Sequence, residues 1–209
     1  MAESRTGRRG SYAKGVAKRE EILERALEVI AREGYRGASV KELADAVGLS
    51  QAGLLHYFDS KEELFTAIMR KRDEVDLAHF APTIIETPSV AELREGYVGV
   101  IRHNSDVPGL VQLYSQMAVD AADPQHPAHE FFLERGANLR GMFASALAAH
   151  SASGEISDRA DPETLARIFQ AVADGLQLQW MLEPDVDMAG IVADLFDLLT
   201  QPRSDRTPE

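Results

Sequence analysis

The chain has 209 residues, of which 44% are hydrophobic and 27% are charged, as in ordinary soluble globular proteins. No apolar run approaches the ~18 residues that indicate a membrane span, and no apolar stretch follows the basic N-terminus as in a secretory signal. The sequence contains no cysteine, which excludes disulfides, thiolate metal ligands and a cysteine nucleophile. We therefore expect a cytoplasmic protein without a metal or another cofactor.

The formal net charge of −12 is unevenly distributed along the chain. Residues 1–80 hold 14 Lys and Arg against 14 Asp and Glu, and residues 81–209 hold the remaining 8 against 20. Residues 1–19 alone carry six basic side chains and a single acid, Glu3. This asymmetry predicts a basic end that contacts a polyanion and an acidic end that keeps the protein soluble.

The N-terminal third shows four helix starts in succession. Apolar residues at helical spacing predict a helix over residues 18–33, and Gly34 is placed to end it. Ser39 and Glu42 have the spacing of a capping box, and so do Ser60 and Glu63. Between them, Ser50 is placed to cap a short helix. The inward face of the first helix is predicted to comprise Ile22, Leu23, Ala26, Leu27 and Ile30.

Similar signals continue to about residue 200. The predicted starts are Ser89 with Glu92 after Thr87-Pro88, Asp106 to Pro108, His126-Pro127, Asp161-Pro162 and Asp187, and the predicted ends include about His103, a loop at 151–154 and about Glu183. No segment alternates convincingly as a strand would. The pattern predicts an all-α protein of about nine helices, with a polar, frayed tail from Gln201.

Residues 39–57 have the features of a helix-turn-helix. Ala44 is small enough for two helices to cross closely, and Gly48 tolerates the positive φ of the turn. The miniature core is predicted to comprise Val40, Leu43, Val47, Leu49 and Leu54. The second helix would present Gln51, Ala52, Gly53, Leu55, His56 and Tyr57 to the major groove. Among these, Gln51 is the side chain that can read adenine through two hydrogen bonds.

At this point the sequence resembles the TetR family of transcriptional regulators. The resemblance covers residues 16–75 and rests on Glu33-Gly34-Tyr35, Ser39-Val40, Val47-Gly48-Leu49-Ser50, Tyr57-Phe58 and Ser60-Lys61-Glu62-Glu63-Leu64. It implies that the third helix reads bases and that Ser39, Tyr57 and Lys61 bind phosphates. The full predicted DNA-binding set is Ser39, Lys41, Ser50, Gln51, Ala52, Gly53, Leu55, His56, Tyr57 and Lys61, with Arg8 and Arg9. One departure is Leu55, where the family often has tyrosine.

Residues 1–15 form a basic arm with two open interpretations. The arm, including Arg8 and Arg9, can contact the minor groove, as other basic N-terminal arms do. Alternatively, it is a disordered leader. Disorder in the unbound protein and order on DNA are compatible.

Residues 76–200 are predicted to form a helical ligand-sensing and dimerisation domain. A small DNA-reading head specifies too few bases alone, so we expect a homodimer on a near-palindromic double-stranded operator. The resemblance implies dimerisation through the last two helices, and residues 173–180 resemble the BetI-like branch of the family. The proposed faces are Leu165, Ile168, Phe169, Val172 and Leu176 with Ile191, Leu195, Phe196 and Leu199. The alternative is that these residues fill the core of one protomer.

The resemblance also implies that a small molecule binds inside this domain and changes the spacing of the two heads. The candidate ligand-binding residues are His103, Tyr114, Met117, Phe132, Asn138, Met142, Gln170, Asp174, Gln177 and Trp180. Asp174 and Gln177 lie about one helical turn apart and form the best polar pair.

No motif predicts catalysis or a metal site. His126 and His129 are separated by Pro127 at a helix start and lack a second ligand cluster, so capping and solvent-facing roles are predicted. There is no Gly-rich phosphate loop, nucleophile elbow or ordered His-Ser-Asp set. The resemblance therefore implies a repressor released from its operator by a small apolar ligand. The alternatives are a constitutive regulator whose body only dimerises and an enzyme with a vestigial head.

Overall fold

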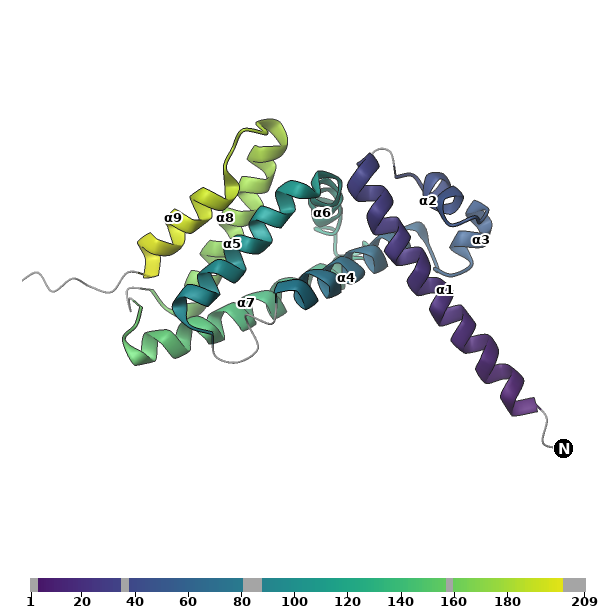
Figure 1. Ribbon diagram of the computed structural model, residues 1–209, viewed down its shortest axis with the longest axis horizontal. Coiled ribbons are helices and arrows are strands. Elements are labelled where there is room, and N and C mark those ends of the chain that lie inside the picture. The colour runs from purple at the N-terminus through teal and green to yellow at the C-terminus, as the bar shows by residue number, and fades with distance from the viewer. Residues whose placement is uncertain (1–3, 35–37, 81–87, 157–159, 201–209) are drawn as a thin grey trace, which may run out of the picture. The chain divides into compact units, whose positions relative to one another are not determined.

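The computed structural model describes residues 4–34, 38–80, 88–156 and 160–200, without the side chains of residues 4–12 and of Phe80 (Figure 1). Within these ranges the chain forms nine α-helices and no strand, which confirms the predicted all-α class. The helices are α1 (Ser4–Glu33), α2 (Val40–Ala46), α3 (Gln51–Leu55), α4 (Lys61–Phe80), α5 (Val90–Asp106), α6 (Pro108–Asp120), α7 (His129–Ser153), α8 (Pro162–Leu182) and α9 (Met188–Thr200).

The chain divides into two compact units. The first comprises residues 1–75 and 107–128, and the second comprises residues 76–106 and 129–209. The first break, after Val75, coincides with the predicted end of the DNA-binding domain. However, α6 groups with the N-terminal unit, whereas the predicted domain 76–200 included it.

Two contacts explain why α6 joins the first unit. Gly109, at the start of α6, lies so close to α1 that a Cβ atom there would be 2.1 Å from the Ile30 carbonyl oxygen. From α4, the buried Arg72 donates a hydrogen bond from Nη1 to the Leu110 carbonyl at 3.2 Å. A glycine and a buried arginine therefore hold the first turn of α6 against both α1 and α4.

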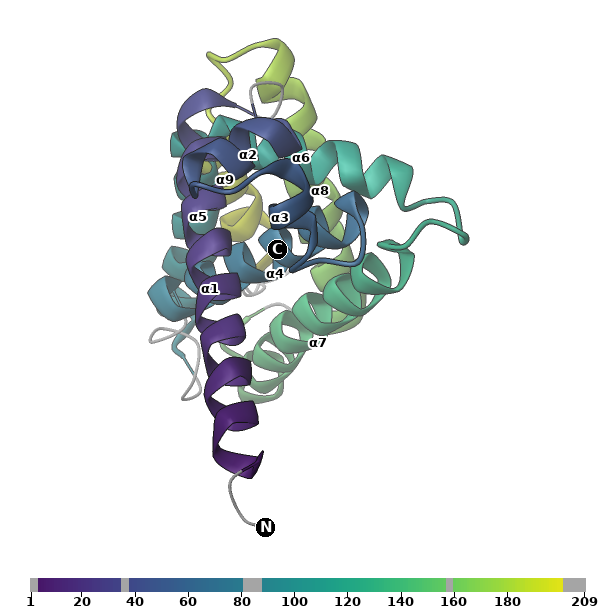
Figure 2. The same cartoon turned by 90° about the vertical axis from the view of Figure 1, so that its right-hand side faces the viewer.

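Helix α1 begins at Ser4, well before the predicted start at residue 18. Its N-terminal part continues beyond the level of α2 and α3 (Figures 1 and 2). The backbone of most of the predicted arm is therefore helical, although the apolar periodicity that marks a packed helix starts only at Ile22. At the other end, Gly34 has φ of +77°, and its N–H donates to the Ile30 carbonyl, as the predicted C′ glycine should.

The predicted caps mostly form. Ser39 and Glu42 make a complete capping box at α2, and Ser89 and Glu92 exchange the same pair of bonds at α5. Asp161 accepts from the Thr164 N–H at 3.0 Å, and Pro162 follows as the first residue of α8. Thr87 lies outside the described residues, as does the tail from Gln201.

Helix α7 starts at His129, later than the predicted start at His126-Pro127. The Nδ1 atom of His126 accepts a hydrogen bond from the Ala128 N–H at 3.2 Å, which stabilises a turn before the helix. This histidine therefore has a local capping role. Within the described ranges, no group of three or more acidic or histidine side chains is placed to hold a metal ion.

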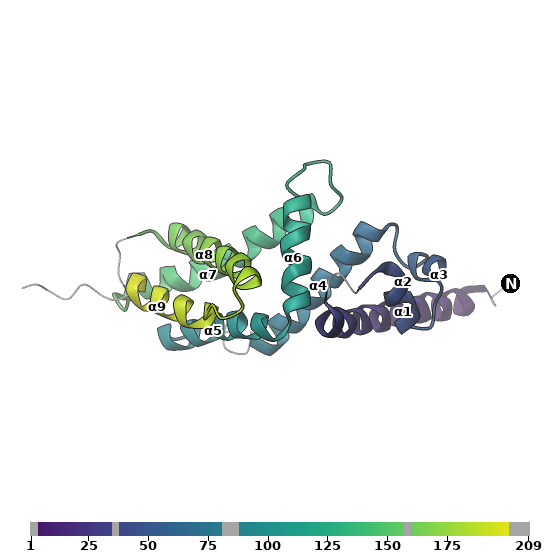
Figure 3. The same cartoon turned by 90° about the horizontal axis from the view of Figure 1, so that it is seen from above.

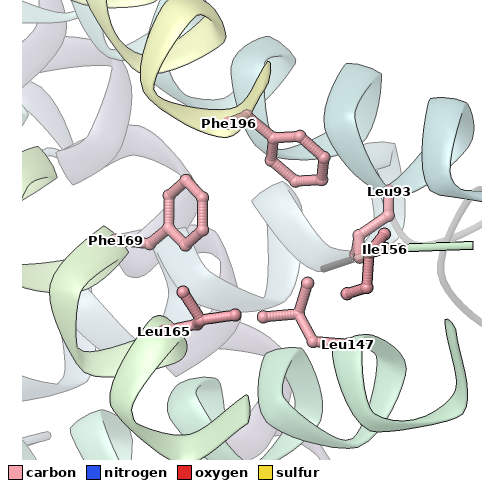
Figure 4. Packing of buried hydrophobic residues seen from close by; sticks show 6 residues of the cluster. All are labelled: Leu93, Leu147, Ile156, Leu165, Phe169 and Phe196. Atoms are coloured by element: carbon pink, nitrogen blue, oxygen red, sulfur yellow. The ribbon is translucent and has the colours of Figure 1, made fainter. Parts of the chain in front are cut away.

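The second unit has an aromatic and aliphatic core in which side chains from α5, α7, α8 and α9 converge (Figure 4). The buried cluster comprises Leu93, Leu147, Ile156, Leu165, Phe169 and Phe196. Helix α9 packs against both α5 and α8, and Figure 3 shows these three helices near one another. At its margin, the Tyr97 hydroxyl donates to the Phe169 carbonyl at 2.8 Å. Outside the core, Arg94 of α5 makes a bidentate ion pair with Asp197 of α9.

This core corrects the predicted dimer faces. Leu165, Phe169, Leu176 and Phe196 are all at most 5% exposed and fill the interior of one protomer. The large apolar side chains that remain exposed on the same two helices are Leu178, Leu182, Ile191 and Leu198. The predicted faces included every apolar residue on one side of each helix. The residues at the centre of each apolar side are buried within the protomer and are not available to a partner.

Among the described residues, no helix is long and apolar enough to cross a membrane.

Candidate DNA-binding site

Helices α2 and α3 form a compact helix-turn-helix beside α1 (Figure 2). Ala44 is fully buried where the helices cross, and Gly48 has φ of +70° in the turn, as the sequence predicted. Leu43 and Leu54 are also buried and join the two helices to the core of the unit. Of the predicted miniature core, Val40, Val47 and Leu49 are only partly buried.

The turn is held by side-chain caps at both helix starts. Ser39 Oγ accepts from the Glu42 N–H at 3.3 Å, and Ser50 Oγ accepts from the Gly53 N–H at 3.0 Å. The hydroxyl and backbone amide of Ser39 lower the pKa of Glu42 by hydrogen bonding to its carboxylate. Ser50 uses an oxygen lone pair for its cap, so its hydroxyl hydrogen is available to donate to a phosphate.

The short α3 presents a small, uncharged surface to solvent. Gln51 and Ala52 are exposed, whereas Gly53 and Leu55 are partly buried. A Cβ atom at Gly53 would lie 3.2 Å from Ser50 Oγ, which explains a small residue at this position. The exposed carboxamide of Gln51 at the N-terminal end of α3 is thus accessible to base edges.

The segment after α3 carries the predicted phosphate contacts. Helix α3 ends at Leu55, so His56 and Tyr57 follow the helix instead of belonging to it. Their rings pack edge to face, with centroids 6.0 Å apart. Lys61, the first residue of α4, is exposed and has its Nζ atom 5.7 Å from the centre of the Phe65 ring. Together with the exposed Ser39 and Lys41 of the α2 start, these residues complete the predicted interface.

The second predicted capping box is only half formed. Ser60 Oγ accepts from the Glu63 N–H at 3.0 Å, but the Glu63 carboxylate accepts a hydrogen bond from Arg19 Nη2 at 2.5 Å. Arg19 of α1 therefore binds the Glu63 carboxylate, which in a complete capping box would accept a hydrogen bond from the Ser60 N–H. Of the remaining predicted elements, Tyr35 and the side chains of Arg8 and Arg9 lie outside the described residues.

The predicted ligand-binding residues are divided between the two units. Tyr114 and Met117 lie on α6, which belongs to the first unit, and the other eight lie in the second. Within the second unit, Asn138 and Met142 are exposed on α7. Gln170 accepts a hydrogen bond from Arg140 at 2.8 Å, and Phe132 packs edge to face on Phe131.

The predicted ligand-binding residues of α5 and α8 are buried or partly buried. Gln177 is buried and donates to the Ala173 carbonyl, and Asp174 is partly buried one turn away. Burial and the charge of Asp174 raise the pKa of the nearby Tyr97 phenol. Trp180 packs beside the buried cluster that includes Ile101 and Val192, and His103 lies 3.7 Å from Asp76. The assignment of these residues to a ligand stays a prediction.

Some residues with clear structural roles have no marker in the sequence. Arg19 was part of the basic N-terminal stretch, yet its guanidinium contacts the α3–α4 segment. Arg72 and Tyr97 make their hydrogen bonds to carbonyls far along the chain. These partners are separated by tens of residues, so neither spacing nor periodicity could identify them.

Two protein-family models match the chain. The model described as "Bacterial regulatory proteins, tetR family" matches residues 22–68, which include α2, α3 and the start of α4. The model described as "BetI-type transcriptional repressor, C-terminal" matches residues 119–201. The two matches follow the predicted order of a DNA-binding head and a helical body.

Related proteins with similar sequences are named as helix-turn-helix transcriptional repressors. The HTH-type transcriptional repressor AcnR of Corynebacterium efficiens is 41% identical over 81 residues, covering 39% of this chain and 41% of that protein. The chain thus spans about two fifths of the length of the AcnR relatives that it matches. The HTH-type transcriptional repressor Rv1474c of Mycobacterium tuberculosis is 26% identical over 183 residues, covering 87% of this chain and 91% of that protein. These relatives are transcriptional regulators and not enzymes.

Solved structures share the fold. A TetR-family transcriptional regulator from Rhodococcus sp. superposes with a TM-score of 0.70 at 21% identity, covering 88% of this chain and 98% of that chain. The matched family models, the curated relatives and the shared fold agree with the helix-turn-helix geometry. The chain therefore belongs to the TetR family of transcriptional regulators, and its C-terminal region resembles BetI-type repressors.

Proposed function

We propose that this protein is a homodimeric transcriptional repressor that binds a near-palindromic double-stranded operator and leaves it when a small apolar ligand binds. The observation that carries the proposal is the exposed edge of the helix-turn-helix. Gln51 is exposed at the start of α3, which would read bases, and Ser39, Tyr57 and Lys61 lie at the caps and turns that would bind phosphates. The repressor role is supported by the names of the AcnR and Rv1474c relatives.

The DNA-binding part is tested by selecting bound sequences from a random duplex pool with the full chain. We expect a two-fold symmetric consensus with half-site centres about 10 base pairs apart. Binding of that sequence is then measured by fluorescence anisotropy at several salt concentrations. Lys61→Ala should weaken binding and reduce the salt slope by about 0.9, the contribution of one phosphate contact.

Three further variants make the assignment of roles specific. Tyr57→Phe should weaken binding to all sequences alike, because a phosphate contact carries no sequence information. Gln51→Ala should instead relax the preference at one base position, by about fivefold to a hundredfold. Arg32→Ala removes an exposed cation of α1 outside the predicted set and serves as the control. If Lys61→Ala and Tyr57→Phe leave affinity and slope unchanged, the phosphate assignment is wrong.

Dimerisation is supported by apolar side chains of α8 and α9 that are exposed to solvent. Leu182 is 84% exposed and Leu198 is 68% exposed, and Leu178 and Ile191 are about half exposed. On α8, Ile168, Ala171, Gly175, Leu178 and Leu182 recur at spacings of three or four, which places them on one face. An open depression of about 260 Å³ lies on this helix and is lined by Glu163, Thr164, Arg167, Ile168 and Ala171. A second copy of the chain would cover this face and supply side chains for the depression.

Ligand release is supported by the polar groups held within the apolar second unit. Asp174 places a carboxylate near Tyr97, and the buried carboxamide of Gln177 lies one helical turn from Asp174. A few polar groups in apolar surroundings are typical of small-molecule sites. Trp180 is the single tryptophan of the chain and packs beside this region, so its fluorescence reports changes there.

The sensing step is tested by adding fractionated metabolites to the protein–operator complex. A fraction that both releases operator and changes Trp180 fluorescence supports sensing. Release without a fluorescence change would argue that the ligand binds elsewhere. If no fraction releases the operator, the protein is a constitutive regulator whose second unit only dimerises.

A further inference from the structure

Arg19 of α1 contacts the segment that joins α3 to α4 in three ways. Its Nη1 atom donates to the carbonyl oxygen of Tyr57, and its Nη2 atom donates to Glu63 Oε1 at 2.5 Å. Its guanidinium carbon lies 4.2 Å from the centre of the Phe58 ring, which is buried. One side chain of α1 therefore holds the backbone, a ring and the first turn of α4 in the segment from Tyr57 to Glu63.

The local structure explains why this segment needs an external partner. Because α3 ends at Leu55, the carbonyl of Tyr57 lies beyond the helix and Arg19 supplies its hydrogen-bond donor. Glu63 is drawn away from the usual capping-box bond to Ser60 by the same guanidinium. Arg19 thus spans the five-residue connection between α3 and α4. This connection contains Tyr57, one predicted phosphate contact, and it is followed by Lys61, the other.

The charges favour a positioning role over a direct contact with DNA. The carboxylate of Glu63 neutralises the guanidinium, and Nη1 and Nη2 both donate to acceptors within the protein. The next residue, Glu20, pairs with Lys71 of α4, whose side chain is 14% exposed. Neighbouring residues of α1 therefore make ion pairs of opposite polarity with two different turns of α4.

We propose that Arg19 is a positioning residue for DNA binding: it fixes the Tyr57–Lys61 edge against α1 so that both phosphate contacts are preorganised before DNA arrives. The inference rests on the proposed function for the role of Tyr57 and Lys61, but the immobilisation of the edge is a property of the unbound protein. The proposal predicts that position 19 requires a side chain that can donate to the Tyr57 carbonyl and to Glu63 at the same time, and not merely a positive charge.

The test compares Arg19→Lys with Arg19→Gln in the full-length chain. Lysine keeps the charge but lacks the planar fork that reaches the Tyr57 carbonyl and Glu63 together. We expect both variants to weaken binding of the selected operator by a similar factor, about tenfold to a hundredfold. Arg25→Lys and Arg25→Gln are the matched controls, because Arg25 is an exposed arginine of the same helix that pairs with Glu28 one turn away. Neither control should change affinity by more than about twofold.

A double-mutant cycle separates positioning from direct contact. If Arg19 acts through the edge, Arg19→Gln and Lys61→Ala together should cost less than the sum of their separate effects. Arg19→Gln and Gln51→Ala should be closer to additive. The inference is overturned if Arg19→Lys restores wild-type affinity while Arg19→Gln lowers the salt slope additively with Lys61→Ala. That result would make Arg19 a phosphate contact.

Hydrogen exchange in the unbound protein gives a readout that does not depend on DNA. Arg19→Lys should accelerate exchange of the backbone amides from Tyr57 to Glu63 and leave those of α8 unchanged. Glu63→Gln keeps the hydrogen bond from Arg19 to the Tyr57 carbonyl, so it should accelerate exchange less than Arg19→Lys does. Unchanged exchange in Arg19→Lys overturns the inference. If the wild-type chain selects no DNA, the proposed function fails, while the exchange result still decides whether Arg19 immobilises this segment.

Discussion

At the scale of single residues, the proposed DNA-binding edge is built from side chains that both cap helices and remain exposed to solvent. Ser39 and Ser50 accept backbone hydrogen bonds through Oγ while remaining exposed. Gly53 is small because Ser50 Oγ lies close above it. The same atoms that start α2 and α3 therefore define how closely a duplex can approach them.

Leu55 is the residue whose substitution should change this edge most directly. It is partly buried at the end of α3, where the family often has tyrosine. Leu55→Tyr should add a hydroxyl that donates to a phosphate, raising operator affinity by about tenfold with a steeper salt dependence. Anisotropy titrations with the selected operator measure both quantities.

Leu55→Phe is the matched control for this prediction. It adds the ring without the hydroxyl, so it should not reproduce the gain in affinity. Equal effects of tyrosine and phenylalanine would mean that position 55 does not face a phosphate. A loss of affinity in both variants would instead show that the partly buried site has no room for a ring.

At the scale of elements, the first turn of α6 is the most tightly constrained junction of the first unit. Gly109→Ala would place Cβ 2.1 Å from the Ile30 carbonyl oxygen and 2.7 Å from Gly34 Cα, both of which are backbone atoms. Backbone gives way less readily than a flexible side chain, so we expect destabilisation of about 1–3 kcal/mol or more. Urea denaturation followed by far-UV circular dichroism measures this change.

Gly141→Ala provides the contrasting control. Gly141 lies within α7, and a Cβ atom there would meet nothing within 4 Å. Alanine should therefore stabilise the helix by about 0.5–1 kcal/mol. If the two alanine variants destabilise the protein equally, the close approach at Gly109 is not what limits α6.

The pair between α5 and α9 makes a prediction about pH. Hydrogen bonds from Arg94 lower the pKa of Asp197, so this carboxylate stabilises the fold above its unfolded pKa of about 3.9 and loses that effect as pH falls through the lowered value. Asp197→Asn should lower the free energy of unfolding at pH 7 by about 1 kcal/mol or less, since the carboxylate is about half exposed.

The dependence on pH is the decisive part of that measurement. The difference between wild type and Asp197→Asn should shrink as pH falls and vanish where Asp197 is protonated in both states. Glu95→Gln, which removes the other carboxylate on Arg94, is the control and should have a smaller effect at pH 7. A difference that stays constant down to the acid transition would assign the effect to packing and not to the ion pair.

At the scale of the whole molecule, the exposed apolar face of α8 and α9 predicts how copies of the chain assemble. Leu178→Arg places a charge in the proposed interface and should convert the dimer to a monomer at micromolar concentration in sedimentation velocity. Operator affinity should fall by about a hundredfold or more, because the second head no longer binds at high effective concentration.

Leu133→Arg is the matched control for the interface. Leu133 of α7 is 55% exposed, close to the 51% of Leu178, but it lies on a different helix. This variant should remain dimeric and keep operator affinity. If both variants are monomeric, the interface includes α7, and if both are dimeric, the proposed α8–α9 interface is wrong.

Charge is also organised at this scale. Residues 81–209 carry the whole net charge of −12, whereas residues 1–80 are balanced. The acidic excess thus lies outside the part of the sequence that contains α2 and α3. A pI of about 5.0 is therefore compatible with DNA binding.

Local signals in the sequence were sufficient for the element order and for the caps and turn of the helix-turn-helix. The capping box at Ser39, the C′ glycine at Gly34 and the turn glycine at Gly48 each act within a few residues, and all three have the predicted geometry. For the same reason, Gln51 and Lys61 could be placed on an exposed helix start before any tertiary contact was known.

Tertiary structure decided which partner each side chain uses. An amphipathic stripe on α8 does not say that Phe169 faces the protomer interior and Leu178 faces solvent, since that depends on where α5, α7 and α9 pack. Likewise, a basic residue near the N-terminus becomes a bridge to Tyr57 and Glu63 only when α1 lies beside the α3–α4 segment. Helix caps and turns arise from bonds within a few residues, whereas burial and ion pairing join residues that only the fold brings together.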